Sequence, residues 1–159
     1  IPFFDEQDKM FAFQGRAFGK ENPKYITIVL DSERDKIYGL NKINWNKKVY
    51  VVEGPIDSMF LPNALAMAGS DIDDTTQFYA RDVVFVYDNE RRNKEIVAKM
   101  EKAMKKGFAV CIWPDAIKVK DINDMVLIGM DILQIEETIN TNTFRGLPAR
   151  VKLNQWKRT

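Results

Sequence analysis

The chain has 159 residues, 45% of them hydrophobic and 30% charged, which suits one globular domain with a buried core, or one domain plus a small appendage. The formal net charge is only +1, so any contact with nucleic acid must come from local basic patches. There is no histidine and only one cysteine, which excludes Ser-His-Asp triads, HExxH sites and a structural zinc site within this chain.

The sequence contains neither a signal peptide nor an apolar run long enough for a transmembrane helix, so no membrane contact is expected. Cys111 lies in an apolar run and is expected to be a buried thiol in a reducing compartment. The chain starts at Ile1, inside a strand-like run, which favours a fragment of something longer.

Residues 1–45 predict an N-terminal sub-domain built on a small antiparallel sheet. Its strands are expected at 1–4, 10–13 and 25–29, and a connector with one short helix follows over 36–48. Arg16, Lys20 and Lys24 cluster at the connections of this sheet. They either bind phosphate, which suits arginine, or form a solvated basic edge that discourages strand pairing.

Residues 46–130 predict a mostly parallel sheet flanked by helices, because strands and helices alternate there. The β-branched run 49–52 is a strand that ends at Glu53, and Gly54-Pro55 then turns the chain into a helix expected to continue over 58–65. A short strand is expected at 66–68. A short helix is expected to follow the acidic stretch 71–76 and to extend through Tyr79.

The strand 83–87 is continuously apolar, as a central parallel strand should be, and is followed by Asp88-Asn89-Glu90. Residues 91–106 have helical spacing, with the lysines, Lys99 among them, expected on a solvated face and Gly107 at the C-cap. A strand at 109–112, a loop at 115–120, and helices through Ile128 and over 132–139 complete the pattern.

Residues 131–159 predict a helical, basic tail. From Arg145 onward there are five basic residues, one tryptophan and no acid. Such a segment binds nucleic acid or a partner, or is a frayed terminus, and the frayed terminus is favoured slightly.

Acidic residues follow three successive strands: Glu53, then Asp88 with Glu90, then Asp121 with Asp124. The carboxyl ends of parallel strands meet at one edge of a sheet, so these carboxylates are expected to gather. Their pKa values then rise, or a cation neutralises them, and oxygen ligands without histidine or cysteine select Mg²⁺ or Mn²⁺. The alternatives are an ordinary polar loop at 88–90 and a helix N-cap at Asp121 and Asp124.

These acidic segments resemble the three motifs of the Toprim fold, as found in DnaG-type primases: Glu53-Gly54-Pro55-Ile56-Asp57, Asp88-Asn89-Glu90 and Lys120-Asp121-Ile122-Asn123-Asp124. Residues 11–17, 24–27 and 37–40 are similar to the segment that leads into the Toprim core of primases. The resemblance to the primases of T4-like bacteriophages extends over nearly the whole chain.

The resemblance implies synthesis of short RNA primers on a single-stranded DNA template from ribonucleoside triphosphates, by two-metal nucleotidyl transfer. Glu53 would serve in proton transfer or metal binding, and Asp57 would lie beside the metal. The metal ligands would be Asp88, Glu90, Asp121 and Asp124, and the nucleotide or DNA contacts would be Arg16, Lys24 and Lys120. The implied cofactor is Mg²⁺ or Mn²⁺.

The same resemblance implies a hexameric replicative helicase as partner, a zinc-binding module of the same protein that is absent from this chain, and a location in the host cell cytoplasm. Two other functions stay open. A Toprim nuclease would share the acids but cleave DNA, and a non-catalytic module would only dock helicase or nucleic acid.

Overall fold

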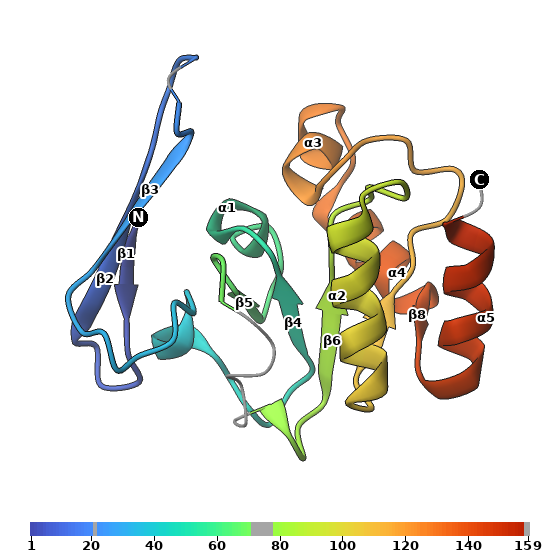
Figure 1. Ribbon diagram of the computed structural model, residues 1–159, viewed down its shortest axis with the longest axis horizontal. Coiled ribbons are helices and arrows are strands. Elements are labelled where there is room, and N and C mark those ends of the chain that lie inside the picture. The colour runs from blue at the N-terminus through green and yellow to red at the C-terminus, as the bar shows by residue number, and fades with distance from the viewer. Residues whose placement is uncertain (21, 71–77, 158–159) are drawn as a thin grey trace.

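The computed structural model of the chain describes residues 1–20, 22–70 and 78–157. These residues form two sheets, one of three strands in the order β1-β2-β3 and one of five in the order β5-β4-β6-β7-β8 (Figure 1). The small sheet is antiparallel; in the large one β5, β4, β6 and β7 are parallel and β8 is antiparallel. The α/β class, with a mostly parallel sheet and a small N-terminal antiparallel sheet, is confirmed.

The small sheet consists of β1 (Pro2–Phe4), β2 (Met10–Arg16) and β3 (Tyr25–Val29), close to the predicted ranges. Phe3 and Phe11 are buried and join the core that also packs on the large sheet. The connector contains the predicted short helix, η1 (Leu40–Lys42). Just before it, Tyr38 pairs with Ala66 of β5, which ties the connector to the edge of the large sheet.

The central strands are buried at every position, since both faces of the large sheet are covered. These strands are β4 (Val49–Val52) and β6 (Val83–Val86), with β5 (Ala64–Ala66) and β7 (Ala109–Cys111) beside them. Successive side chains enter opposite cores: Val49 and Val51 pack in one cluster, and Tyr50 and Val52 in the other. Cys111 is fully buried, as expected.

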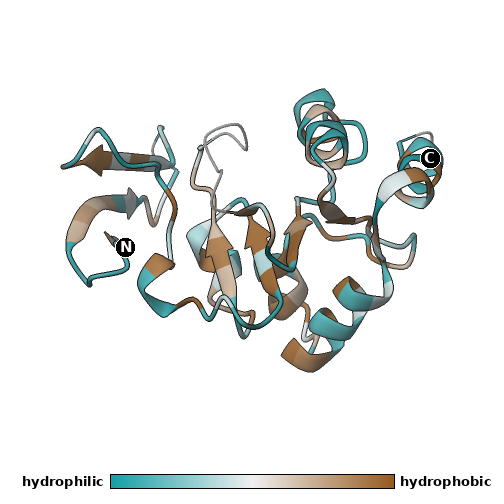
Figure 2. Cartoon of the chain, turned by 90° about the horizontal axis from the view of Figure 1, so that it is seen from below, coloured by the Kyte–Doolittle hydropathy of each residue, from teal (hydrophilic) through white to brown (hydrophobic). Residues whose placement is uncertain are grey.

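Helices cover both faces of this sheet (Figures 1 and 2). On one side lie α2 (Lys94–Lys105) and α5 (Gly146–Trp156), and on the other lie α3 (Ile122–Leu127) and α4 (Ile132–Thr141). The predicted apolar face of α2 is buried at Ile96, Met100, Ala103 and Met104. Gly107 follows the helix with a φ of 85°, a left-handed conformation that glycine adopts without strain.

The helix predicted to continue over 58–65 is wrong. The helix α1 covers only Pro55–Ser58, and β5 starts at Ala64, earlier than the predicted strand at 66–68. Pro62 explains the early stop, because a proline disfavours helical backbone at the residue before it. Asn63 then fixes the turn, since its Nδ2 donates to the carbonyl oxygen of Lys48 at 2.8 Å. Most of the helix predicted through Tyr79 falls on 71–77, outside the described residues.

The favoured interpretation of the C-terminal segment as a frayed terminus is wrong. Residues 143–144 form β8, which pairs with β7, and α5 follows at once. Ala149, Leu153 and Trp156 are buried against the core shared with α2. Their spacing places them on one helix face, and the basic residues of α5 lie off that face. The domain boundaries predicted after residues 45 and 130 stay predictions.

None of the described helices is both long and apolar enough to cross a membrane.

Replacing Leu153 with alanine should lower the free energy of unfolding by roughly 2–5 kcal/mol, because the side chain is only 2% exposed and its loss leaves a cavity. Val151→Ala is the matched control on the same helix, since Val151 is 50% exposed, and should change stability by less than about 0.5 kcal/mol. Urea denaturation measures both. Equal, small effects would mean that α5 is not part of the cooperative core.

Candidate active site at the carboxyl edge of the large sheet

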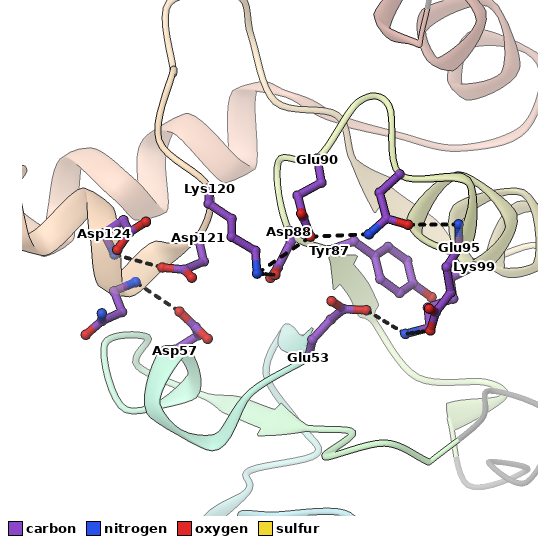
Figure 3. Close-up of polar contacts among 12 residues, drawn as sticks. Glu53, Asp57, Tyr87, Asp88, Glu90, Glu95, Lys99, Lys120, Asp121 and Asp124 are labelled. Atoms are coloured by element: carbon purple, nitrogen blue, oxygen red, sulfur yellow. Dashed lines mark hydrogen bonds and ion pairs between the residues drawn. The ribbon is translucent and has the colours of Figure 1, made fainter. Parts of the chain in front are cut away.

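The parallel pairing of β4 with β6 places two of the acidic segments beside each other. Val52 pairs with Val86, so Glu53 and Asp88 follow the two strands at the same edge of the sheet. The chain after β7 returns to this edge at Asp121, directly before α3. The close-up in Figure 3 shows Glu53, Asp88 and Asp121 at this edge, with Lys120 between Asp88 and Asp121. The expected gathering of the three acidic segments is therefore present in the structure.

A single asparagine holds the second and third acidic segments together. The backbone N–H of Asn89 donates to the carbonyl oxygen of Lys120 at 2.6 Å, and its side-chain amide donates to the carbonyl oxygens of Ile117 and Val119 at 2.9 and 3.1 Å. These bonds pull the 117–120 loop against the turn after β6. Sequence analysis did not predict this function of Asn89. The available signal was an amide side chain between Asp88 and Glu90, directly after a strand.

This arrangement brings Lys120 onto the acids. Its ammonium nitrogen lies 3.3 Å from an oxygen of Asp88 and 3.6 Å from an oxygen of Glu90 (Figure 3). Lys120 was expected to contact nucleotide or DNA, and that role stays a prediction. In the structure it neutralises part of the charge on two expected metal ligands.

The remaining acids surround the start of α3. Asp57, on α1, accepts a hydrogen bond from the backbone N–H of Asn123 at 2.9 Å. Asp121 is the N-cap of α3 and accepts from the N–H of Asp124 at 2.8 Å, as the capping alternative predicted. Each of these contacts is made by the Oδ1 atom of the carboxylate. A Cβ on Gly54 would lie 2.8 Å from an oxygen of Asp57, so glycine leaves room for this carboxylate.

Glu53 is paired with a lysine that sequence analysis assigned to a solvated face. Lys99 of α2 places its ammonium nitrogen 3.0 Å from an oxygen of Glu53 and 3.1 Å from an oxygen of Glu95. The Lys99 side chain is 42% exposed, so it lies on the solvated side of α2 as predicted, and it also reaches two carboxylates. Helical periodicity showed only that Lys99 lies off the buried face of α2, and not that this side of α2 borders the strand ends.

A pocket of about 320 Å³ opens next to this ion pair. Apolar and polar side chains share its wall: Glu53, Met67, Ser70, Tyr87, Glu95 and Lys99, with Gly69. Pockets at the carboxyl ends of parallel strands are the usual ligand sites of open α/β sheets.

Two of the carboxyl groups have raised pKa values, first because they are buried and second because other carboxylates are near. Burial, followed by the negative charge of Glu53, raises the pKa of Asp88 to about 7, against the opposing effect of Lys120. Burial also raises the pKa of Asp57, and the charges of Asp121 and Asp124 act in the same direction. The rise in pKa predicted from the sequence is thus present at two of the acids.

The donor groups fit a hard divalent cation, because every candidate ligand is a carboxylate. As they stand, however, no three acidic side chains among the described residues are close enough together to hold one metal ion. The ammonium group of Lys99 forms an ion pair with Glu53, and that of Lys120 forms ion pairs with Asp88 and Glu90. Metal binding would therefore require a rearrangement of side chains.

Arg16 and Lys24 lie apart from the acids, at the end of the small sheet. Their cationic groups are 5.6 and 5.7 Å from the ring centroid of Tyr25, which pairs with Arg16 across β2 and β3. This end of the small sheet and the carboxyl ends of β4 and β6 point to the same side of the molecule (Figure 1).

Comparisons with known proteins agree with this fold. No protein-family model matches the chain. DNA primase of Enterobacteria phage T4 is 38% identical to this chain, in an alignment that covers 98% of this chain and 46% of that protein. The chain thus spans less than half of this relative.

Solved primase structures share the fold at low identity. The Aquifex aeolicus primase, comprising zinc-binding and RNA polymerase domains, aligns with a TM-score of 0.71 at 18% identity over 99% of this chain and 44% of that one. A DnaG primase catalytic domain bound to single-stranded DNA aligns with a TM-score of 0.68 at 18% identity, over 97% of this chain and 60% of that one. The expected resemblance is therefore confirmed: the chain has the fold of DnaG-type primase catalytic cores and is similar, over almost its whole length, to a phage DNA primase.

Proposed function

We propose that this chain is the catalytic core of a DNA primase, which joins ribonucleotides into short RNA primers on a single-stranded DNA template. The observation that supports this most directly is the gathering of Glu53, Asp88 and Asp121 at one sheet edge, in a fold shared with primase cores. The similarity to T4 DNA primase gives independent support.

The proposed reaction is nucleotidyl transfer. A ribose hydroxyl attacks the α-phosphorus of a nucleoside triphosphate, a new P–O bond forms, the bond to the β-phosphate oxygen breaks and pyrophosphate leaves. Asp88, Glu90, Asp121 and Asp124 would hold Mg²⁺ or Mn²⁺, with Asp57 next to them. The bound metal would supply charge stabilisation for the attacking and departing oxygens.

The chain's own residues would then complete the site. Glu53 would accept the hydroxyl proton or take part in metal binding, and the polar loop at Asn89 would keep Asp88 and Glu90 facing the α3 start. Lys120 would move from the acids to the triphosphate when a metal replaces it. Arg16 and Lys24 would contact the phosphates of template or nucleotide, since Arg and Lys side chains are the common phosphate ligands.

The partners of the whole protein follow from the same proposal. They are a hexameric replicative helicase and a zinc-binding module on another part of the polypeptide. Such an enzyme would work in the host cell cytoplasm. The T4 relative and the primase structures are all longer than this chain, so primer synthesis is best tested in the full-length protein.

Replacing Asp88 with alanine should reduce Mg²⁺-dependent dinucleotide synthesis by the full-length protein about a hundredfold or more, because a metal ligand is lost. Asp82→Ala is the matched control, since Asp82 immediately precedes β6, at the opposite end of the same strand, and is exposed. It should leave the rate within about twofold. Synthesis retained by Asp88→Ala would contradict the proposal, and cleavage of labelled DNA with Mn²⁺ in place of synthesis would favour the nuclease alternative.

Asp88 should also make stability depend on pH in metal-free buffer. Because its pKa is raised to about 7 in the folded protein from an ordinary value of 3.8, the folded state holds the proton more tightly than the unfolded state. Stability from this group is complete below about pH 4 and is lost as pH rises toward 7. The melting temperature of Asp88→Asn should therefore exceed that of the wild type by an amount that grows over this range and then levels off.

Thermal melts from pH 4 to 8 with EDTA measure this difference. Adding Mg²⁺ should raise the melting temperature of the wild type at pH 8 and leave Asp88→Asn less affected, since binding favours the ionised carboxylate. A difference between the two proteins that is constant with pH would mean that Asp88 titrates normally.

Arg16→Ala should weaken binding of single-stranded DNA several-fold and reduce the slope of log affinity against log salt by about 0.7, the value for one phosphate contact. Lys47→Ala removes the same charge at an exposed position just before β4, at the opposite edge of the large sheet, and should change neither quantity. Fluorescence anisotropy at several salt concentrations measures both. Equal losses for the two variants would make the effect one of overall charge.

A further inference from the structure

The ammonium group of Lys99 lies on one of the two carboxylate oxygens through which Glu53 could bind a cation. Its nitrogen is 3.0 Å from Glu53 Oε1 and 3.1 Å from Glu95 Oε1, beside the pocket at the strand ends (Figure 3). The Lys99 ammonium group is thus shared between Glu53, in the first acidic segment, and Glu95, on the same helix as Lys99. None of the roles proposed above for the acids and basic residues uses Lys99.

The core sets the backbone position of Lys99. It lies on α2 between Ile96 and Met100, which are 3% and 1% exposed and anchor the helix to the sheet. Helical geometry then directs Lys99 toward the edge of the sheet that carries Glu53. Because the backbone of both partners is held by buried neighbours, the pairing is a built feature of the fold.

The contact is nevertheless open enough to be broken. The Lys99 side chain is 42% exposed and that of Glu53 is 24% exposed, and ion pairs of this accessibility contribute about 1 kcal/mol or less. A divalent cation carries twice the charge of an ammonium group and approaches a carboxylate oxygen to about 2.1 Å. A metal ion and the ammonium group cannot both lie on the same Glu53 oxygen without strong repulsion.

Taking the proposed metal-dependent function as the basis, we propose that Lys99 is a positioning residue that acts as an internal counter-ion. It holds the Glu53 carboxylate in place in the metal-free protein, and a divalent cation displaces it when the cation binds. Glu95, whose side chain is 75% exposed, then retains the displaced ammonium group through the i,i+4 pair. The lysine thus limits repulsion among the acids without closing the site.

Calorimetric titration with MnCl₂ tests this proposal in the full-length protein. Lys99→Met and Lys99→Gln should bind Mn²⁺ about three- to tenfold more tightly than the wild type, since no ammonium group has to be displaced and one positive charge near the ion is gone. Without metal, both variants should melt at a lower temperature than the wild type. Lys99→Arg keeps the charge and should bind Mn²⁺ within about twofold of the wild type.

Lys105→Met is the matched control, because it removes the same charge from the exposed end of the same helix. It should leave the Mn²⁺ affinity unchanged. Unchanged or weaker affinity in both neutral variants of Lys99, or equal tightening by Lys105→Met, would overturn the counter-ion proposal while leaving the primase proposal standing. A wild-type protein that binds no Mn²⁺ at millimolar concentrations would overturn the metal-dependent function itself, and the counter-ion proposal with it.

Discussion

The parallel pairing of β4, β6 and β7 is the constraint on which the rest of this molecule depends. Neighbouring parallel strands end at the same edge, so each acid that follows a strand is delivered to a common place. The pairing is stable because the central strands are buried on both faces, between α2 and α5 on one side and α3 and α4 on the other. The core and the site are therefore products of one arrangement.

Gathering acids at an edge has an electrostatic cost, and the structure offsets it in two ways. Backbone N–H groups at the start of α3 bind Asp57 and Asp121, and ammonium groups approach the others, with Lys120 on Asp88 and Lys99 on Glu53. The compensation is partial, since burial and, after it, the charge of Glu53 still raise the pKa of Asp88 to about 7. Partial neutralisation of this kind is what the proposed exchange of lysine ammonium groups for a metal ion requires.

The low identity to the solved primase cores, 18% for two of them, is compatible with a shared fold because a core requires apolar volume and pattern rather than particular side chains. The C-terminal segment illustrates this tolerance. Its basic residues suggested an unpacked tail, yet three apolar side chains at helical spacing, Ala149, Leu153 and Trp156, are buried in the core shared with α2.

Local sequence determined much of this protein. Continuous apolar runs identified β4 and β6, helical spacing identified α2, and the acids at the strand ends identified the edge that carries the candidate site. Only the tertiary structure decided which lysine side chains face those acids. Lys99 and Glu53 are far apart in the chain, and whether a lysine on a solvent-side helix position reaches a strand end depends on how α2 packs across the sheet. Periodicity defines the faces of a helix, but the neighbours of each face are set by long-range packing.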